Sequence, residues 1–238
     1  MLFSILSGGD WRDIVINLLL TLPVILMALS FHEAAHAFAA YKMGDRTAYN
    51  LGRVTLNPAK HLDLFGTLSM LIIGYGWAKP VPIHARNFRN PKKGMAITAI
   101  AGPLANLALG LLGTNFCAIT YVAMTLNLFT LLENDMLFRI VDIIFTLFYY
   151  MGVMNFIFMF FNLIPVPPFD GSRFFGMFLP DKLYFDIMRY ERYILLAVLL
   201  GSVVCSNLFD FSPFGWLGTK FFELIFNPLT NLMFKIFV

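Results

Sequence analysis

The chain has 238 residues, of which 59% are hydrophobic and only 13% are charged, against about 25% charged in an ordinary soluble domain. A soluble core of this size cannot bury so much apolar surface, so the composition excludes an ordinary soluble enzyme and indicates a protein embedded in the lipid bilayer. The net charge of +3 is modest and gives no indication of a nucleic-acid partner.

Four apolar segments predict transmembrane helices, and with the C-terminal run they predict an all-α, polytopic bundle of about four to six such helices. The four segments cover residues 13–41, 94–124, 140–163 and, in a shorter run, 193–207. Residues 62–77 are apolar but short and contain glycines, which favours a re-entrant or short β segment between the first two helices. Asn227-Pro228 interrupts the C-terminal run, which either lies in the membrane interface or forms a fifth span.

Basic residues are concentrated in two parts of the chain. Nine lysines and arginines and only two aspartates lie between residues 42 and 93, and four more basic residues lie between 171 and 192. Cytoplasmic loops of membrane proteins carry such an excess of positive residues. We therefore expect a multi-pass protein of the cell membrane, in which the first and third predicted spans both end on the cytoplasmic side. No polar stretch is long enough for a second folded unit, so residues 1–238 are expected to form one integral-membrane domain.

The first predicted span contains two histidines and a glutamate, His32, Glu33 and His36. Residues four apart share one face of a helix, so both imidazoles can bind the same ion. The H-E-x-x-H pattern is typical of zinc metalloproteases, in which the glutamate is the general base. With four histidines and four glutamates, the pattern arises by chance in roughly one such chain in a thousand. The alternative is a polar patch satisfied by neighbouring helices, but ionisable residues inside a membrane generally mark function.

A catalytic zinc site normally has three protein ligands and one open position, so a third ligand is needed. His61 and His84 lie in the basic segment and are interpreted as surface or packing residues. Asp170, in "FNLIPVPPFDGSR" (161–173), is the better candidate, because it follows the third predicted span at the depth of the histidines. The prolines break the helix there, and Asp170-Gly171 predicts a turn. Broken backbone at membrane depth is tolerated where it lines a cavity. The alternative is a proline-rich loop with a capping aspartate.

These motifs together resemble the site-2 protease family of intramembrane zinc metalloproteases, in its small bacterial form that lacks PDZ and CBS domains. The resemblance rests on "FHEAAHA" (31–37) and on "NLIPVPPFDG" (162–171), which is similar to the N-x-x-P-x-x-x-x-D-G signature of the family. Similar segments between them extend the resemblance over roughly residues 25 to 190, among them "GRVTLNPAKHLDLFGTL" (52–68) and "AGPLANL" (101–107).

The resemblance implies one zinc ion per chain, bound by His32, His36 and Asp170, with Glu33 as the general base. It also implies that Asn162 handles the substrate or stabilises the oxyanion, whereas the residues alone fit a helix-terminal cap equally well. Family members cleave transmembrane segments, so the expected partners are transmembrane proteins or peptides, hydrolysed in regulated intramembrane proteolysis. On the expected cytoplasmic side, zinc would activate a water molecule and Glu33 would accept its proton.

Two other functions use the same residues. A zinc-carrying transporter or sensor would need the same ligands. Transporters usually show repeated halves, however, and this sequence has no second histidine motif or inverted repeat. A silent scaffold that binds transmembrane partners would not need Glu33. Residues 72–82 offer either a backbone edge for an extended substrate or a purely structural loop. The sequence gives no indication of the oligomeric state.

A stripe of small or polar residues recurs every four positions along the second predicted span. It consists of Gly102, Asn106, Gly110 and Thr114. Small residues in such a stripe let transmembrane helices approach closely. We therefore expect this helix to be packing scaffold.

Overall fold

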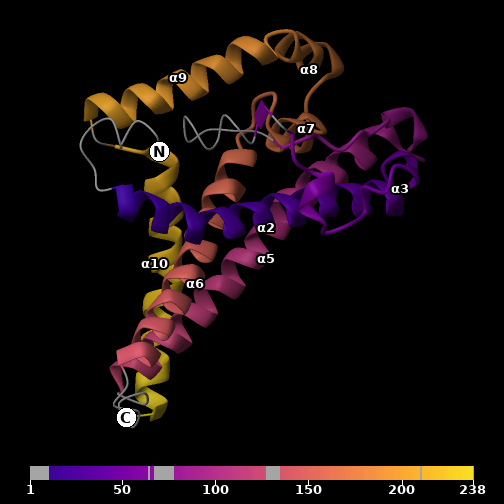
Figure 1. Ribbon diagram of the computed structural model, residues 1–238. Coiled ribbons are helices and arrows are strands. Elements are labelled where there is room, and N and C mark those ends of the chain that lie inside the picture. Colours follow the sequence, from indigo (N-terminus) through magenta and orange to yellow (C-terminus); the bar gives the residue numbers. More distant parts are fainter. Residues whose placement is uncertain (1–10, 64, 67–77, 127–134, 210, 238) are drawn as a thin grey trace. The chain divides into compact units, whose positions relative to one another are not determined.

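The structure is a computed structural model that describes residues 11–63, 65–66, 78–126, 135–209 and 211–237. Its long helices, shown in Figure 1, are α2 (Trp11–Met43), α5 (Pro91–Thr125), α6 (Asp135–Asn162), α9 (Glu191–Phe209) and α10 (Pro213–Phe237). The short elements are α3 (Thr47–Asn50), η1 (Pro58–Lys60), η2 (Ala85–Asn87), α7 (Asp170–Gly176) and α8 (Asp181–Met188). Within these ranges the β structure is one isolated bridge between Leu62 and Ala78, so the predicted all-α class is confirmed.

Three of the described helices are long and apolar enough to cross a membrane. They comprise Val15–Met43 of α2, Pro91–Thr125 of α5 and Met136–Asn162 of α6. These helices coincide with the first three predicted spans. The fourth predicted span coincides with α9, which is not one of the three, so the count of four to six spans stays a prediction. The segment 62–77 lies almost wholly outside the described residues.

The predicted interruption at Asn227-Pro228 is wrong, because α10 is one helix with Pro228 in its interior. Proline lacks the N–H that would bond the carbonyl four residues earlier. The Thr230 hydroxyl lies 3.1 Å from the carbonyl oxygen of Phe226 and 3.0 Å from that of Asn227. These carbonyls lie four and three residues before Thr230, so the contacts do not replace the bond to the carbonyl of Leu224 that Pro228 removes, and the helix continues without it.

The described chain divides into two compact units. The first comprises Met1–Ala105 with Asn162–Ile194, and the second comprises Asn106–Phe161 with Leu195–Val238. The core of the second unit is built around Cys117, Val153, Phe156 and Phe222, which are all buried. The expectation that residues 1–238 form a single domain stays a prediction.

Close helix packing in the second unit depends on small residues of α5, as the stripe predicts. Gly110 lies directly against the ring of Phe156, and a Cβ atom on Gly113 would lie only 2.7 Å from the backbone nitrogen of Gly152. Asn106 is fully buried and donates a hydrogen bond of 2.9 Å from Nδ2 to Asn155 Oδ1. The stripe is therefore scaffold here.

Helix α2 ends at Met43 because Gly44 adopts a φ of +114°, which side-chain-bearing residues rarely reach. The next residue, Asp45, is fully buried. Its carboxylate accepts hydrogen bonds from the backbone N–H of His84 at 2.7 Å and from Asn87 Nδ2 at 2.8 Å. It also accepts from the N–H and hydroxyl of Thr47, at 3.0 and 2.6 Å. Asp45 thus ties the end of α2 to the chain around residue 84.

Asp45 is expected to make the stability of the protein depend on pH. Burial alone would raise the pKa of its carboxyl, but the hydrogen bonds from His84, Thr47 and Asn87 outweigh burial and lower it from 3.8 to about 2. A lowered folded-state pKa stabilises the fold above the ordinary pKa, and this stabilisation is lost as the pH falls through about 4 to 2. Asp45→Asn should therefore lower the free energy of unfolding by about 2 kcal/mol at pH 6.

The measurement is chemical unfolding of the detergent-solubilised protein between pH 6 and pH 2.5. The stability difference between the parent and Asp45→Asn should shrink steadily as the pH falls. The matched control is Asp186→Asn, because Asp186 is an exposed residue of α8. A difference of the same size at every pH would contradict the expected role of the ionised carboxylate.

Candidate metal centre

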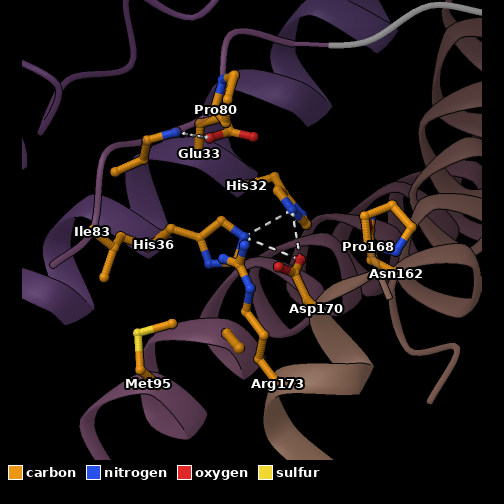
Figure 2. Close-up of a pocket in the computed structure, with 12 residues that line it drawn as sticks. His32, Glu33, His36, Pro80, Ile83, Met95, Asn162, Pro168, Asp170 and Arg173 are labelled. Carbon is orange, nitrogen blue, oxygen red and sulfur yellow. Dashed lines mark hydrogen bonds and ion pairs between the residues drawn. The ribbon is translucent and has the colours of Figure 1, made fainter. Parts of the chain in front are cut away.

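Three side chains from two distant parts of the chain meet at one point of the first unit. His36 Nε2 lies 3.0 Å from His32 Nε2, and Asp170 Oδ2 lies 3.1 Å from each of these nitrogens. Both histidines are buried and Asp170 is nearly so. Figure 2 shows the three groups converging, with the imidazoles on α2 and the carboxylate on α7. The sequence-based expectation that these residues lie together agrees with this geometry.

Helix α5 fixes the orientation of the His36 ring. His36 Nδ1 lies 2.7 Å from the carbonyl oxygen of Thr98. Since a carbonyl only accepts, Nδ1 must carry a hydrogen, so Nε2 faces the other two groups and is the nitrogen through which the neutral ring would bind a metal. Backbone carbonyls commonly orient metal-binding histidines in this way, and they raise the basicity of the ligating nitrogen.

Gly102 of α5 provides the space for both rings. A Cβ atom at this position would lie 2.5 Å from His36 Nε2 and 2.6 Å from His32 Cε1. We expect Gly102→Ala to displace the imidazoles and lower zinc affinity at least tenfold, since even changes in outer-shell partners cost 10- to 100-fold. Alanine favours helix by about 1 kcal/mol over glycine, so the loss cannot come from helix propensity.

The zinc affinity of Gly102→Ala would be measured by competition with a chromophoric chelator. Gly201→Ala is the matched control, because Gly201 is a helical glycine of α9, and apart from its own helix the described residues place no atom within 4 Å of the added Cβ. Parent-like zinc affinity in Gly102→Ala would show that the rings tolerate the methyl group, and it would contradict this account of the α5 surface.

Asp170 reaches the histidines because the chain leaves α6 at Asn162 and re-enters a helix eight residues later. The prolines between them end α6, as the sequence predicts. The predicted turn at Asp170-Gly171 is wrong in detail, because Asp170 is the first residue of α7 and the turn precedes it. Gly171 packs directly against the carbonyl group of Leu163, where a Cβ atom has no room. This close contact sets where α7 begins.

Glu33 is held in the same pocket by a backbone donor. The N–H of Val81 donates to Glu33 Oε2 at 3.1 Å. The pocket is also lined by Asn162 and Arg173, beside the two histidines and Asp170. The structure therefore brings together all five residues that the sequence singled out, while His61 and His84 lie elsewhere, His61 as a buried packing residue and His84 exposed.

Some residues of the site were missed from the sequence. Thr98 and Val81 contribute through backbone atoms, which no side-chain pattern reveals. Arg173 lines the pocket, and its position three residues after Asp170 could have indicated that both share a helical face. That spacing was the one available signal.

The donor set fits a zinc ion. Donor atoms on a tetrahedral zinc, with bonds of about 2.0 to 2.1 Å, lie about 3.3 Å apart, close to the separations of 3.0 and 3.1 Å seen here. Burial raises the pKa of the Asp170 carboxyl, but the adjacent His36 and His32 outweigh it and lower this pKa below its ordinary range. The carboxyl is therefore ionised, which is the form that binds metal.

Two imidazoles one helical turn apart, a distant carboxylate and an adjacent glutamate define a zinc metalloprotease centre on an apolar helix. The chain belongs to Peptidase family M50, whose family model matches residues 20–201. It is thus a zinc metalloprotease of the site-2 protease type, associated with the membrane.

Individual relatives agree with this membership. The chain is 35% identical over 211 residues to "Putative zinc metalloprotease YwhC" of Bacillus subtilis (strain 168), covering 86% of this chain and 91% of the relative. It is 36% identical over 91 residues to "Putative zinc metalloprotease Rip2" of Mycolicibacterium smegmatis, covering 37% of this chain and 35% of that protein. No solved structure matches the chain significantly.

Proposed function

We propose that this protein is an intramembrane zinc endopeptidase that hydrolyses peptide bonds within or near transmembrane segments of membrane-protein substrates. The observation that carries the proposal is the convergence of His32, His36 and Asp170 on a helix apolar enough to cross a membrane. Membership of a zinc metalloprotease family supports the chemistry. The position of both histidines inside a candidate span supports cleavage at membrane depth.

His32, His36 and Asp170 would hold the metal. When bound there, zinc supplies an acidified water molecule and polarises the peptide carbonyl. Glu33 accepts the proton of the attacking water and delivers it to the nitrogen of the leaving amine. The N–H of Val81, which donates to Glu33 Oε2, holds the carboxylate in the pocket for this task.

Asn162 would donate a hydrogen bond from its side-chain amide to the carbonyl oxygen that gains negative charge. It is the last residue of α6 and lines the pocket together with Pro168. One well-placed donor of this kind contributes about 3 kcal/mol to the stabilisation of the transition state. Its place in the lining of the pocket, beside the metal-binding group, supports this role over that of a helix-terminal cap.

The finer topology belongs to the same proposal. Helices α9 and α10 would add to the three candidate spans, residues 62–77 would form a re-entrant or short β segment, and the whole chain would be one membrane domain. The basic segments around residues 42–93 and 171–192 would place the active site toward the cytoplasm. The 72–82 segment would offer its backbone to an unwound substrate through groups other than those of Lys79, Pro80 and Val81, which already bond His61, Arg53 and Glu33.

The test is a comparison of membrane proteomes from cells that produce the parent enzyme and cells that produce Glu33→Gln. If the proposal is right, uncleaved transmembrane proteins or fragments accumulate only with the variant. A zinc transporter would instead change cellular zinc without changing fragments, and a scaffold would be indifferent to the substitution. Identical proteomes for the two proteins would count against proteolysis.

A further inference from the structure

We propose that Arg53 and Asp45 are positioning residues for the general base, acting through the backbone of residues 78–84. This inference rests on the proposed function, because it gives Arg53 a task in the same reaction. The residues 78–84 are called here the 78–84 segment. The segment is held at both ends, and Val81, the residue that touches Glu33, lies between them.

Arg53 holds the first end of the segment. Its guanidinium donates from Nη2 to the carbonyl oxygen of Lys79 at 2.6 Å and from Nη1 to that of Pro80 at 3.4 Å. Arg53 is only 6% exposed, and its Nε has no hydrogen-bond partner within the part of the chain that the structure describes. The buried cationic guanidinium therefore donates its hydrogen bonds to neutral carbonyl groups.

His61 completes this first end. It is 1% exposed, and its Nε2 donates to the carbonyl oxygen of Thr55 at 2.8 Å. That bond leaves Nδ1 as an acceptor, 3.5 Å from Arg53 Nη2. The backbone carbonyl of His61 accepts a hydrogen bond of 2.7 Å from the N–H of Lys79. Arg53 and His61 thus hold Lys79 on both of its backbone polar groups.

Asp45 holds the other end. Its buried carboxylate accepts the N–H of His84 at 2.7 Å, in the network described above. Between the two ends, Pro80 and Pro82 flank Val81, and each proline has a restricted φ. Val81 is 8% exposed and packs with Ala37 of α2 and with Ala48. Its N–H therefore has little freedom, and it points at Glu33 Oε2.

A role in stability alone does not account for Arg53. Burial of a cation costs its hydration, and the partners of Arg53 named above are all neutral groups. The guanidinium instead fixes two consecutive carbonyls next to the donor that anchors Glu33. A shift of about 1 Å in such a donor can cost a hundredfold in rate, because the base must meet its proton within hydrogen-bond reach.

The test compares Arg53→Met, which removes the donors, with Arg53→Lys, which keeps one cationic donor for Lys79. Arg46→Met is the matched control, because Arg46 is an exposed arginine close to Asp45. Three quantities are measured on the holoenzyme: zinc content, hydrogen exchange of the peptide spanning residues 78–84, and the rate of peptide cleavage. The cleavage substrate is a fluorogenic membrane peptide whose sequence is taken from the fragments that accumulate with Glu33→Gln. For Arg53→Met we expect parent-like zinc content, at least tenfold faster exchange, and a kcat about 10- to 100-fold lower with KM within threefold. Arg53→Lys should recover part of the kcat.

Parent-like kcat in Arg53→Met would overturn the inference, and so would a loss of zinc in parallel with activity, since the role would then be structural. If Arg53→Met does not fold, Asp45→Asn tests the other end: a lower kcat with parent-like zinc content and an exchange increase larger at 78–84 than in the rest of the chain supports the inference, and unchanged kcat, or an exchange increase spread evenly over the chain, overturns it. The exchange measurement needs no cleavage. A parent enzyme that cleaves nothing contradicts the proposed function, whereas an active parent with an equally active Arg53→Met contradicts only this inference.

Discussion

Replacement of Glu33 by glutamine is expected to abolish cleavage while leaving the zinc content of the purified protein unchanged. Glutamine has the length of glutamate, and its amide oxygen still accepts the N–H of Val81 that Glu33 Oε2 accepts at 3.1 Å. It cannot accept a proton from water. Since general acid–base catalysis contributes 10²- to 10⁴-fold, kcat should fall by at least about a hundredfold.

The comparison requires metal analysis and a rate on the same preparation. Glu223→Gln is the matched control, because Glu223 is 43% exposed on α10 and pairs with Lys220 at 2.7 Å. It should cleave at the parent rate. If Glu33→Gln kept most of its activity with full zinc occupancy, Glu33 would not be the base.

Replacement of Asp170 by asparagine is expected to lower zinc affinity by more than a hundredfold. The neutral amide oxygen is a poor zinc ligand, and it removes the one negative charge from the three-residue group. Changes in outer-shell partners alone cost about 10- to 100-fold in metal affinity, so the loss of a direct ligand should exceed that range. Cleavage should disappear together with the metal.

Zinc affinity would be measured by competition with a chelator of known affinity, and stoichiometry by elemental analysis after dialysis. Asp186→Asn serves again as the control, because its exposed carboxylate lies on α8 of the same unit. Parent-like affinity in Asp170→Asn would mean that another group is the third ligand, and the site would need to be reassigned.

Much of the metal-binding group was predictable because its signals are local. Helical periodicity alone places His32 and His36 on one face of a helix, because they are four residues apart. The prolines before Asp170 predict the end of a helix. The distribution of basic residues predicted that the histidines and Asp170 lie at the same depth in the membrane. These arguments need no knowledge of how the helices pack against each other.

The rest depends on contacts between distant segments. The sequence does not predict that the carbonyl of Thr98 faces His36 or that Gly102 lies against both rings. A helix that is apolar on all sides can pack in many rotations about its axis. The continuity of α10 through Pro228 was missed for a related reason, since tertiary context can override the helix-breaking preference of a single proline. Tertiary packing decided these points.

The two halves of the proposed ligand set lie 134 residues apart in the chain. A bound ion would therefore act as a cross-link that closes a very long loop and removes conformational freedom from the unfolded chain. During synthesis the histidine pair emerges long before its carboxylate partner. On this ligand set, a nascent polypeptide cannot assemble its metal centre until the third apolar helix has been made, so hydrolytic competence arrives late in biogenesis.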